Sequence, residues 1–331
     1  MATIAFRDAL REALRQEMQR DPAVFLMGED IARYGGAYAV TKGLLQEFGA
    51  ERVIDTPMSE GTIVGAAAGA AMIGGRPVAE IMYVDFMTFA MDQLVNQAAK
   101  IHYMFGGQIR VPLVVRTQQG TGRGAGAQHS QSLEAWFAHI PGLKVVAPST
   151  PADAKGLLKS AIRDDNPVVF LEHKALYPLK GDVPEDEYLT PLGKADVKRE
   201  GSDVTLISYS QTLQLALQAA DALASEGIDA EVLDLRSLRP LDIETVIASV
   251  SKTKRAVIAH EAALTGGVGA EISARLNEAL FGELRAPIAR VAAYDVPLPA
   301  NSRLEKFVIP DVERISRAAR NTMQARTHAP A

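Results

Sequence analysis

Short apolar runs alternate with helical stretches along this 331-residue chain, and this alternation limits the folds that are open to it. Apolar residues at four-residue spacing from Phe6 to Met18 predict an amphipathic helix, and Thr3 is its expected N-cap. Another helix is expected to begin at Pro151, behind a hydroxyl cap. Strands that alternate with helices form parallel sheets that helices cover on both faces. The predicted strands of the first half are 24–28, 76–81, 111–115, 143–147 and 167–172.

The alternation stops once and then starts again. Residues 181–202 are rich in proline, glycine and charge and have no sustained apolar period, so we place a linker there. A second set of strands follows at 203–209, 230–236, 255–261 and 287–293, separated by helices near 212–226, 242–250 and 268–281. We therefore expect an α/β protein of two domains, 1–180 and 203–331, the second being smaller.

Composition excludes several classes of protein. The chain has no cysteine, which excludes disulfides, thiolate metal sites and cysteine nucleophiles and fits a reducing compartment such as the cytoplasm. The net charge is only −5 with interspersed signs, so no nucleic-acid footprint is visible. No apolar run approaches the roughly 20 residues that span a bilayer, and the N-terminus does not have the pattern of an export signal. We therefore expect neither nucleic acid nor membrane as a partner.

The segment 55–75, DTPMSEGTIVGAAAGAAMIGG, places Glu60 where an extended stretch turns into a helix of small side chains. Taken alone, an acidic residue at a helix start is more often a simple complement to the helix dipole. The small residues would let another backbone approach closely, either from the same domain or from a partner.

The segment 117–136 places a glycine-rich loop and then His129 after a predicted strand. Ligand crevices of open α/β sheets lie at the carboxyl ends of strands, so His129 could act there as a general acid or base. A lone histidine is nevertheless more often structural. The glycine spacing matches neither a phosphate-binding loop nor a dinucleotide fingerprint, which excludes a nucleotide site.

The segment 83–107 joins Phe86 and Phe89 to a helix that carries Gln93. Aromatic residues three apart usually lie in a core, so each ring is more readily explained by packing than by a ligand. The remaining histidines lack metal-ligand spacing, which argues against a zinc site.

Five segments carry a further signal when they are taken in order: GED at 28–30, DTPMSE at 55–60, AQHSQ at 127–131, HIPGLKVVAPSTPADAKGLL at 139–158 and LDLRSLRPLD at 233–242. Together they closely resemble the beta subunits of 2-oxo acid dehydrogenase complexes, which include the pyruvate, branched-chain and acetoin dehydrogenases. The resemblance covers nearly the whole chain. It implies a pyrimidine-type thiamine diphosphate domain followed by a domain that is similar to the transketolase C-terminal domain.

The same resemblance implies roles for individual residues. Glu60 would hydrogen-bond the aminopyrimidine ring of the cofactor and promote the tautomer that removes the thiazolium C2 proton. Phe86 would stack on that ring, and His129 would transfer a proton as the acyl group passes to lipoamide. Residues that would line the pocket are Glu29, Met58 and Gln93.

Partners and ions also follow from the resemblance. Beta subunits of this family form an α2β2 heterotetramer with an alpha subunit, which holds magnesium and the diphosphate through a Gly-Asp-Gly motif that this chain lacks. The second domain would contact a second beta subunit and dock the lipoyl acyltransferase core. A loop that holds a structural potassium ion in some relatives matches Ala161, Asp164 and Asn166.

The resemblance leaves the substrate open. AQHSQ at 127–131 and YMFGG at 103–107 favour pyruvate or acetoin, whereas HEAALTGG at 260–267 is also similar to branched-chain enzymes. Pyruvate is the favoured substrate, with acetoin and branched-chain 2-oxo acids as alternatives. A noncatalytic assembly subunit is a rival of another class, although Glu60 and His129 argue against it. A single-chain sugar-transferring enzyme would need both halves of the site in one polypeptide.

Overall fold

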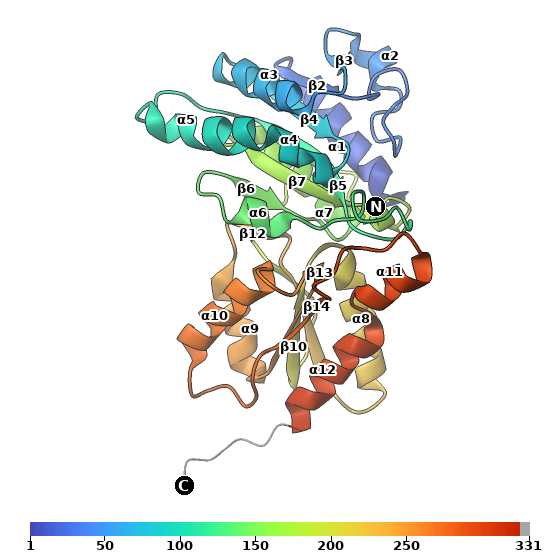
Figure 1. Ribbon diagram of the computed structural model, residues 1–331, viewed down its shortest axis with the longest axis vertical. Helices are drawn as coiled ribbons and strands as arrows, with labels where there is room; N and C mark the ends of the chain where they lie inside the picture. Colours follow the sequence, from blue (N-terminus) through green and yellow to red (C-terminus); the bar gives the residue numbers. More distant parts are fainter. Residues whose placement is uncertain (325–331) are drawn as a thin grey trace. The chain divides into compact units, whose positions relative to one another are not determined.

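The computed structural model describes residues 1–324, and these form two compact units (Figure 1). Unit 1 comprises Met1–Thr121 and Trp136–Leu192, and unit 2 comprises Gly122–Ala135 and the described residues from Gly193 onward. The segment that carries His129 thus belongs to unit 2, although the preceding strand belongs to unit 1. Within the described residues no helix is long and apolar enough to cross a membrane.

The sheet of unit 1 has the strand order β6-β7-β5-β4-β2-β3, and every neighbouring pair is parallel. This confirms the predicted α/β fold. The strand β5 begins at Val114 rather than at 111, because Pro112 has no N–H to donate to a neighbouring strand. The bounds are β2 (Val24–Gly28), β3 (Val53–Asp55), β4 (Arg76–Ile81), β5 (Val114–Gln119), β6 (Lys144–Val146) and β7 (Val168–His173).

Two groups of helices flank this sheet. The helices α1 (Phe6–Arg20) and α7 (Pro151–Arg163) pack together, and their apolar residues share one buried core with β2, β4, β5 and β7. The helix α3 (Glu60–Met72) packs against a second group, in which the middle helix, η2, is a π-helix. That group is α4 (Met87–Met91), η2 (Asp92–Ala98) and α5 (Ala99–Met104). Short helices are α2 (Leu44–Phe48), η1 (Val84–Phe86), α6 (Glu134–Ala138) and η3 (Lys174–Leu176).

One predicted helix cap is right and one is wrong. Thr150 caps α7, since its side chain accepts a hydrogen bond from the backbone N–H of Asp153 at 3.1 Å. Thr3 does not cap α1. It lies in β1 (Ala2–Ala5), which pairs antiparallel with β8 (Lys180–Val183), and its hydroxyl donates to Asp182 at 2.6 Å.

The sheet of unit 2 has the order β14-β13-β10-β11-β9. In Figure 1 the helices α8 and α12 lie on one side of it and α9 and α10 on the other. The edge strand β9 comes from the stretch that we expected to be an unstructured linker, and it pairs antiparallel with β11. The bounds are β9 (Asp196–Arg199), β10 (Val204–Ser208), β11 (Ala230–Asp234), β12 (Ser237–Arg239), β13 (Ala256–Ala263), β14 (Ala289–Ala293), α8 (Ser210–Ala224), α9 (Ile243–Thr253), α10 (Val268–Leu280), α11 (Ser302–Val308) and α12 (Val312–Gln324).

Candidate active site

Two carboxyl groups lie near the carboxyl ends of the adjacent strands β2 and β3. Glu29 directly follows β2 and is only 8% exposed, and Glu60 is the half-buried first residue of α3. Burial raises the pKa of Glu29, and the charge of Glu60 raises it further. The structure therefore brings together two of the residues predicted for the site, and burial lets Glu29 keep its proton more readily than an exposed carboxyl group does.

The loops after β2 and β3 are tied to each other. The backbone N–H of Thr56 donates to the carbonyl of Gly28 at 2.9 Å, and Asp55 accepts from the N–H of Ala32 at 2.6 Å. Two buried side-chain oxygens next to these bonds, Glu29 Oε1 and Thr56 Oγ1, have no hydrogen-bond partner among residues 1–324. Because buried polar atoms are rarely left unpaired, these oxygens fit a polar ligand at the edge of the sheet.

Gln93 and Phe86 follow β4, on the side of α3 that faces α4 and η2. A Cβ added to Gly61 would lie 3.0 Å from the carbonyl oxygen of Phe89, and one added to Gly65 would lie 3.1 Å from Gln93 Cγ. These glycines therefore serve close packing within unit 1. The ring of Phe86 is half-buried and lies parallel to the exposed ring of Phe89, with centroids 6.5 Å apart.

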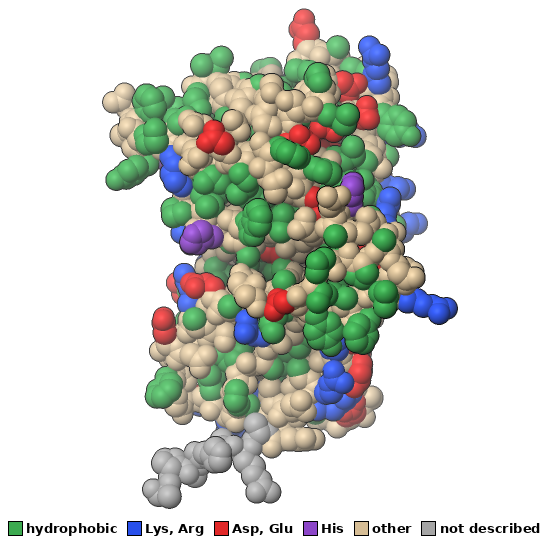
Figure 2. All heavy atoms as spheres, in the orientation of Figure 1, with side chains coloured by type: hydrophobic (Ala, Val, Ile, Leu, Met, Phe, Trp, Pro, Cys, Tyr) green, Lys and Arg blue, Asp and Glu red, His purple; other side chains and the backbone are tan. Residues whose placement is uncertain are grey.

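The adjoining face of α3 is exposed, and it carries Thr62, Ala66 and Gly69. A Cβ on Gly69 would meet no atom within 4 Å. Nearby in sequence, Met58 is 85% exposed. Figure 2 shows hydrophobic side chains gathered over α5, and the exposed residues there are Tyr103, Met104 and Phe105. The small residues at the start of α3 therefore pack within unit 1, and the described residues leave the adjoining face of the helix exposed.

A buried ionic network lies beside the site, and the sequence analysis missed it. Arg116 on β5 donates to Glu80 on β4 at 2.7 Å and to Glu172 on β7 at 2.6 and 2.8 Å. The hydroxyl of Tyr177 donates to Glu172 at 2.6 Å. Burial raises the pKa of Glu172 despite the lowering effect of Arg116. Charged residues within otherwise apolar strand patterns were the available signal, because such residues are almost never buried unless they are paired.

The ring of Tyr177 links this network to the loop that contains Glu29 and Tyr38. Tyr38, in that loop, stacks on Tyr177 with centroids 4.3 Å apart. The stacked rings of Tyr38 and Tyr177 therefore connect the buried ion pairs to the segment between β2 and α2.

His129 lies in unit 2, within the segment Gly122–Ala135. It is half-buried, and its backbone N–H donates to the carbonyl of Gly126 at 3.3 Å. Glu60 and Glu29 lie in unit 1.

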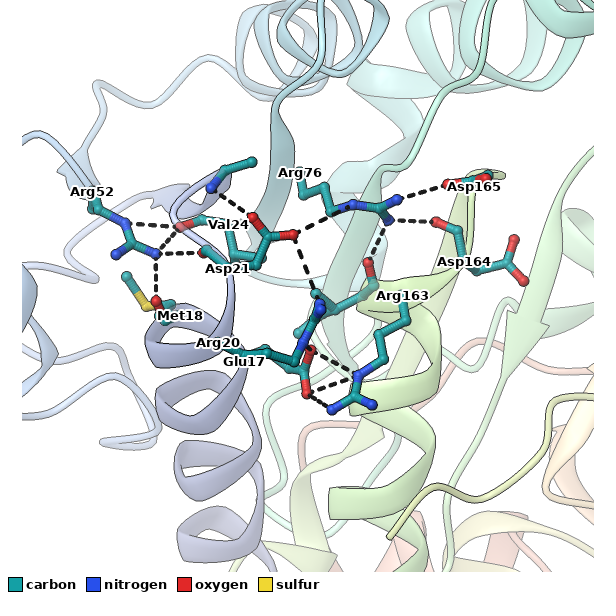
Figure 3. Close-up of polar contacts among 12 residues, drawn as sticks. Glu17, Met18, Arg20, Asp21, Val24, Arg52, Arg76, Arg163, Asp164 and Asp165 are labelled. Atoms are coloured by element: carbon teal, nitrogen blue, oxygen red, sulfur yellow. Dashed lines mark hydrogen bonds and ion pairs between the residues drawn. The ribbon is translucent and has the colours of Figure 1, made fainter. Parts of the chain in front are cut away.

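The loop after α7 holds the three residues predicted to bind potassium. Asp164 Oδ1 accepts from the backbone N–H and the side-chain amide of Asn166, both at 2.9 Å, and Asp164 Oδ2 is paired with Lys144. The carbonyl of Ala161 accepts from the N–H of Asp164 at 3.3 Å. Arg76 donates to the carbonyls of Ile162 and Asp164 at 3.0 and 3.2 Å (Figure 3).

Two cationic side chains therefore already approach the oxygens of this loop. The described residues contain no group of three or more His, Cys, Asp or Glu residues arranged to hold a metal ion. A potassium ion would have to share its oxygens with these donors.

Comparisons with known proteins identify both units. Residues 2–180 match the family model "Transketolase, pyrimidine binding domain", and residues 193–315 match "Transketolase, C-terminal domain". The chain is 51% identical to the pyruvate dehydrogenase E1 component subunit beta-2 of Oryza sativa subsp. japonica, over 95% of this chain and 85% of the relative. It is 50% identical to the corresponding beta subunit of Rhizobium meliloti, over 95% of this chain and 69% of that one.

The chain is a beta subunit of the 2-oxo acid dehydrogenase family. It is also 48% identical to the acetoin:2,6-dichlorophenolindophenol oxidoreductase subunit beta of Cupriavidus necator, over 98% of this chain and 99% of the relative. A solved structure of a split-gene transketolase, described as an inactive beta4 tetramer, has the same fold, with a TM-score of 0.80 at 23% identity over 98% of this chain and all of the other. These comparisons confirm the predicted family and the two-domain fold.

Family membership also explains the donor set of the site. A pyrimidine ring offers ring nitrogens and an amino group, and a carboxyl pair beside a half-buried aromatic ring can hydrogen-bond and stack on such a group. The residues at the ends of β2, β3 and β4 therefore fit the pyrimidine end of thiamine diphosphate.

Proposed function

We propose that this beta subunit supplies the pyrimidine-binding half of a thiamine diphosphate site and takes part in the oxidative decarboxylation of a 2-oxo acid, with transfer of the acyl group to lipoamide. The observation that carries the proposal is the carboxyl pair of Glu29 and Glu60, in which burial and the neighbouring charge raise the pKa of Glu29. Thiamine diphosphate supplies the electron sink that decarboxylation requires.

The residues of unit 1 bind and orient this cofactor. Glu60 holds or accepts a proton at the pyrimidine ring, and Glu29, kept neutral more readily by its burial, is the proton donor and acceptor behind it. Phe86 stacks on the aminopyrimidine ring of the cofactor, and Gln93 and Met58 line the rest of the pocket around that ring. Met58 is exposed in this chain, so its contact with the cofactor requires a partner that closes the site.

His129 is the group proposed to move a proton as the acyl group passes to lipoamide. Histidine suits this task because its unperturbed pKa is close to neutral pH. Replacing His129 with alanine should reduce acyl transfer to lipoamide far more than decarboxylation measured with an artificial electron acceptor. An equal loss in both assays would remove this assignment.

The partner proposed for the open side of the site is an alpha subunit that holds magnesium and the diphosphate, in an α2β2 assembly with a second beta subunit. The exposed residues Tyr103, Met104 and Phe105, which are consecutive in the chain, support a partner on unit 1, because contiguous exposed apolar surface usually marks an interaction site. Unit 2 is the proposed contact for the second beta subunit and for the lipoyl acyltransferase core. Copurification of the chain with a Gly-Asp-Gly-bearing subunit tests the assembly.

Pyruvate is the proposed substrate, and the similarity to the Cupriavidus necator subunit makes acetoin the second candidate. Branched 2-oxo acids are the third. Coexpression with the alpha subunit, followed by assays with pyruvate, acetoin and branched 2-oxo acids, distinguishes them. Pyruvate should give the highest kcat/KM, and a preference for acetoin or a branched acid would overturn the choice of pyruvate.

The resemblance to the family supports a further proposal, a potassium ion bound at the loop of Ala161, Asp164 and Asn166. This ion would bind beside Arg76 and Lys144, which already contact oxygens of the loop. The cytoplasm is the proposed location, on the ground that a chain without cysteine needs no oxidising compartment.

A further inference from the structure

The segment Gly122–Ala135, here called the histidine loop, is held on both sides of His129 by hydrogen bonds to the rest of unit 2. Its anchors on unit 2 are Glu305, Glu261 and Tyr209. Unit 2 belongs to the transketolase C-terminal type, for which assembly was the role expected from sequence. The contacts of the histidine loop indicate an additional role for this unit.

The first anchor is a buried carboxylate. Glu305 lies on α11 and is 2% exposed. It accepts hydrogen bonds from the backbone N–H of Gly122 at 3.1 Å and from that of Gly124 at 3.3 Å. Hydrogen bonds to an ionised acceptor are stronger than those between neutral groups, so one side chain fixes two peptide units at the start of the histidine loop.

The glycines of the histidine loop make this anchor possible. Gly124 has φ +62°, and a Cβ at this position would lie only 2.6 Å from the carbonyl oxygen of Ala300. Gly126 also lies against Ala300, with an ideal Cβ 3.6 Å from the Cβ of that residue. The glycine pattern therefore serves a close approach to the segment before α11, which explains why it resembles no nucleotide-binding loop.

The other end of the histidine loop has two anchors. Ser132 donates to Glu261 at 3.3 Å, and the buried hydroxyl of Tyr209 donates to Glu134 at 2.6 Å. Burial raises the pKa of Tyr209 well above its usual value, with Glu134 acting in the same direction, so the phenol keeps its proton and remains a donor. His129 thus lies between two fixed ends of one short segment.

We propose that Glu305 is a positioning residue for His129: it orders the histidine loop through the amides of Gly122 and Gly124 and so sets where the imidazole stands during acyl transfer. This inference rests on the proposed function. Replacing Glu305 with alanine leaves the N–H groups of Gly122 and Gly124 without this acceptor, and the backbone before His129 is then free to shift. A displacement of about 1 Å of a catalytic group can cost on the order of 100-fold in rate.

The test uses the full chain assembled with its alpha subunit and compares Glu305→Ala and Glu305→Gln with the wild type. Glu278→Ala is the matched control, since Glu278 is an exposed carboxylate of α10 in the same unit. Hydrogen exchange of residues 122–128 reports on the order of the histidine loop, independently of activity. We expect Glu305→Ala to raise this exchange about tenfold or more, Glu305→Gln to give an intermediate value and the control to leave it unchanged.

Acyl transfer to lipoamide supplies the second readout. Glu305→Ala should lower kcat about tenfold or more, with little change in the affinity for thiamine diphosphate, and Glu305→Gln should restore part of the rate. If Glu305 acts through His129, the same substitution in a His129→Ala background should cost less than about twofold.

Three results would overturn the proposal: unchanged exchange in Glu305→Ala, raised exchange with unchanged kcat, or losses that simply multiply in the double variant. Failure of the proposed function looks different. In that case the wild-type assembly itself transfers no acyl group to lipoamide, whatever the exchange measurement shows for Glu305.

Discussion

The carboxyl group of Glu29 is buried directly after β2, and Glu60 lies near it at the start of α3. Burial and the charge of Glu60 together raise the pKa of Glu29 above its usual value. Burial is the larger cause. Both effects favour the neutral form of the Glu29 carboxyl group. This relationship can be measured through stability as well as through activity.

The raised pKa of Glu29 gives a stability that depends on pH. Below the pKa of an unfolded glutamate both states bind the proton and there is no effect. At higher pH the unfolded chain ionises more easily than the folded one, so folding loses stability as pH rises toward the folded pKa. Glu29→Gln should therefore raise the melting temperature at pH 8 and should have little effect near pH 4. A lower melting temperature of the variant at pH 8 would contradict the assignment.

Phe86 offers a test of cofactor stacking. Phe86→Ala should weaken binding of thiamine diphosphate to the assembled enzyme by about three- to tenfold, because an aromatic pair contributes about 0.5–1.5 kcal/mol beyond simple burial. Isothermal titration with the cofactor measures the change. Phe281→Ala is the matched control, since Phe281 is 90% exposed in unit 2 and should leave the affinity unchanged. Equal affinities for the two variants would place Phe86 outside the site.

His260 provides a pH test of unit 2. Burial lowers the pKa of His260 to about 4, and Gly267 and Gly269 leave room for its ring, since added Cβ atoms would lie 2.6 and 2.8 Å from it. The folded state keeps the imidazole neutral while the unfolded chain protonates below its ordinary pKa of about 6.5, so stability is lost as pH falls from that value toward 4.

Between pH 7 and pH 5 this coupling should lower the free energy of unfolding by about 2 kcal/mol. His260→Gln loses packing at every pH but should remove this part of the pH dependence. Urea unfolding of both proteins at the two pH values gives the comparison. Parallel pH dependences in the wild type and the variant would show that His260 ionises equally easily in both states.

The proposed potassium site predicts a stability that depends on the cation. The melting temperature of the assembly should be higher in potassium chloride than in choline chloride at equal ionic strength, because an ion that binds only the folded state stabilises it. Asp164→Asn should reduce this difference. Identical melting temperatures in the two salts would show that Lys144 and Arg76 supply all the positive charge that the loop requires.

The sequence predicted the parts of the fold that have strong local patterns. The strands β2 and β4 have the predicted bounds, and α7 begins at Pro151 behind its predicted cap, because hydrophobic runs and capping residues act locally. The strand β9 was missed because three of its four residues are charged and all four are half-buried. Thr3 was misread because its antiparallel partner, β8, lies far away in sequence.

Long-range contacts account for the rest of the site. The resemblance to a known family supplied Glu60, Phe86 and His129, whereas periodicity alone favoured a structural role for each. The Arg116 network and the anchoring of the histidine loop by Glu305 join residues that are far apart in the chain, so a local pattern can mark a buried charge but cannot identify its partner. The pairing of Glu29 with Glu60 depends on the order of strands in the sheet, which places β2 beside β3.

The most direct test of the account is the activity of Glu60→Gln in the intact assembly. Glutamine keeps the size of the side chain but cannot accept a proton, so decarboxylation should fall by about 100-fold or more while the assembly forms normally. Size-exclusion chromatography and cofactor titration confirm that assembly and binding persist. A rate within about twofold of the wild type, with the cofactor bound, would contradict the claim that Glu60 holds the pyrimidine proton.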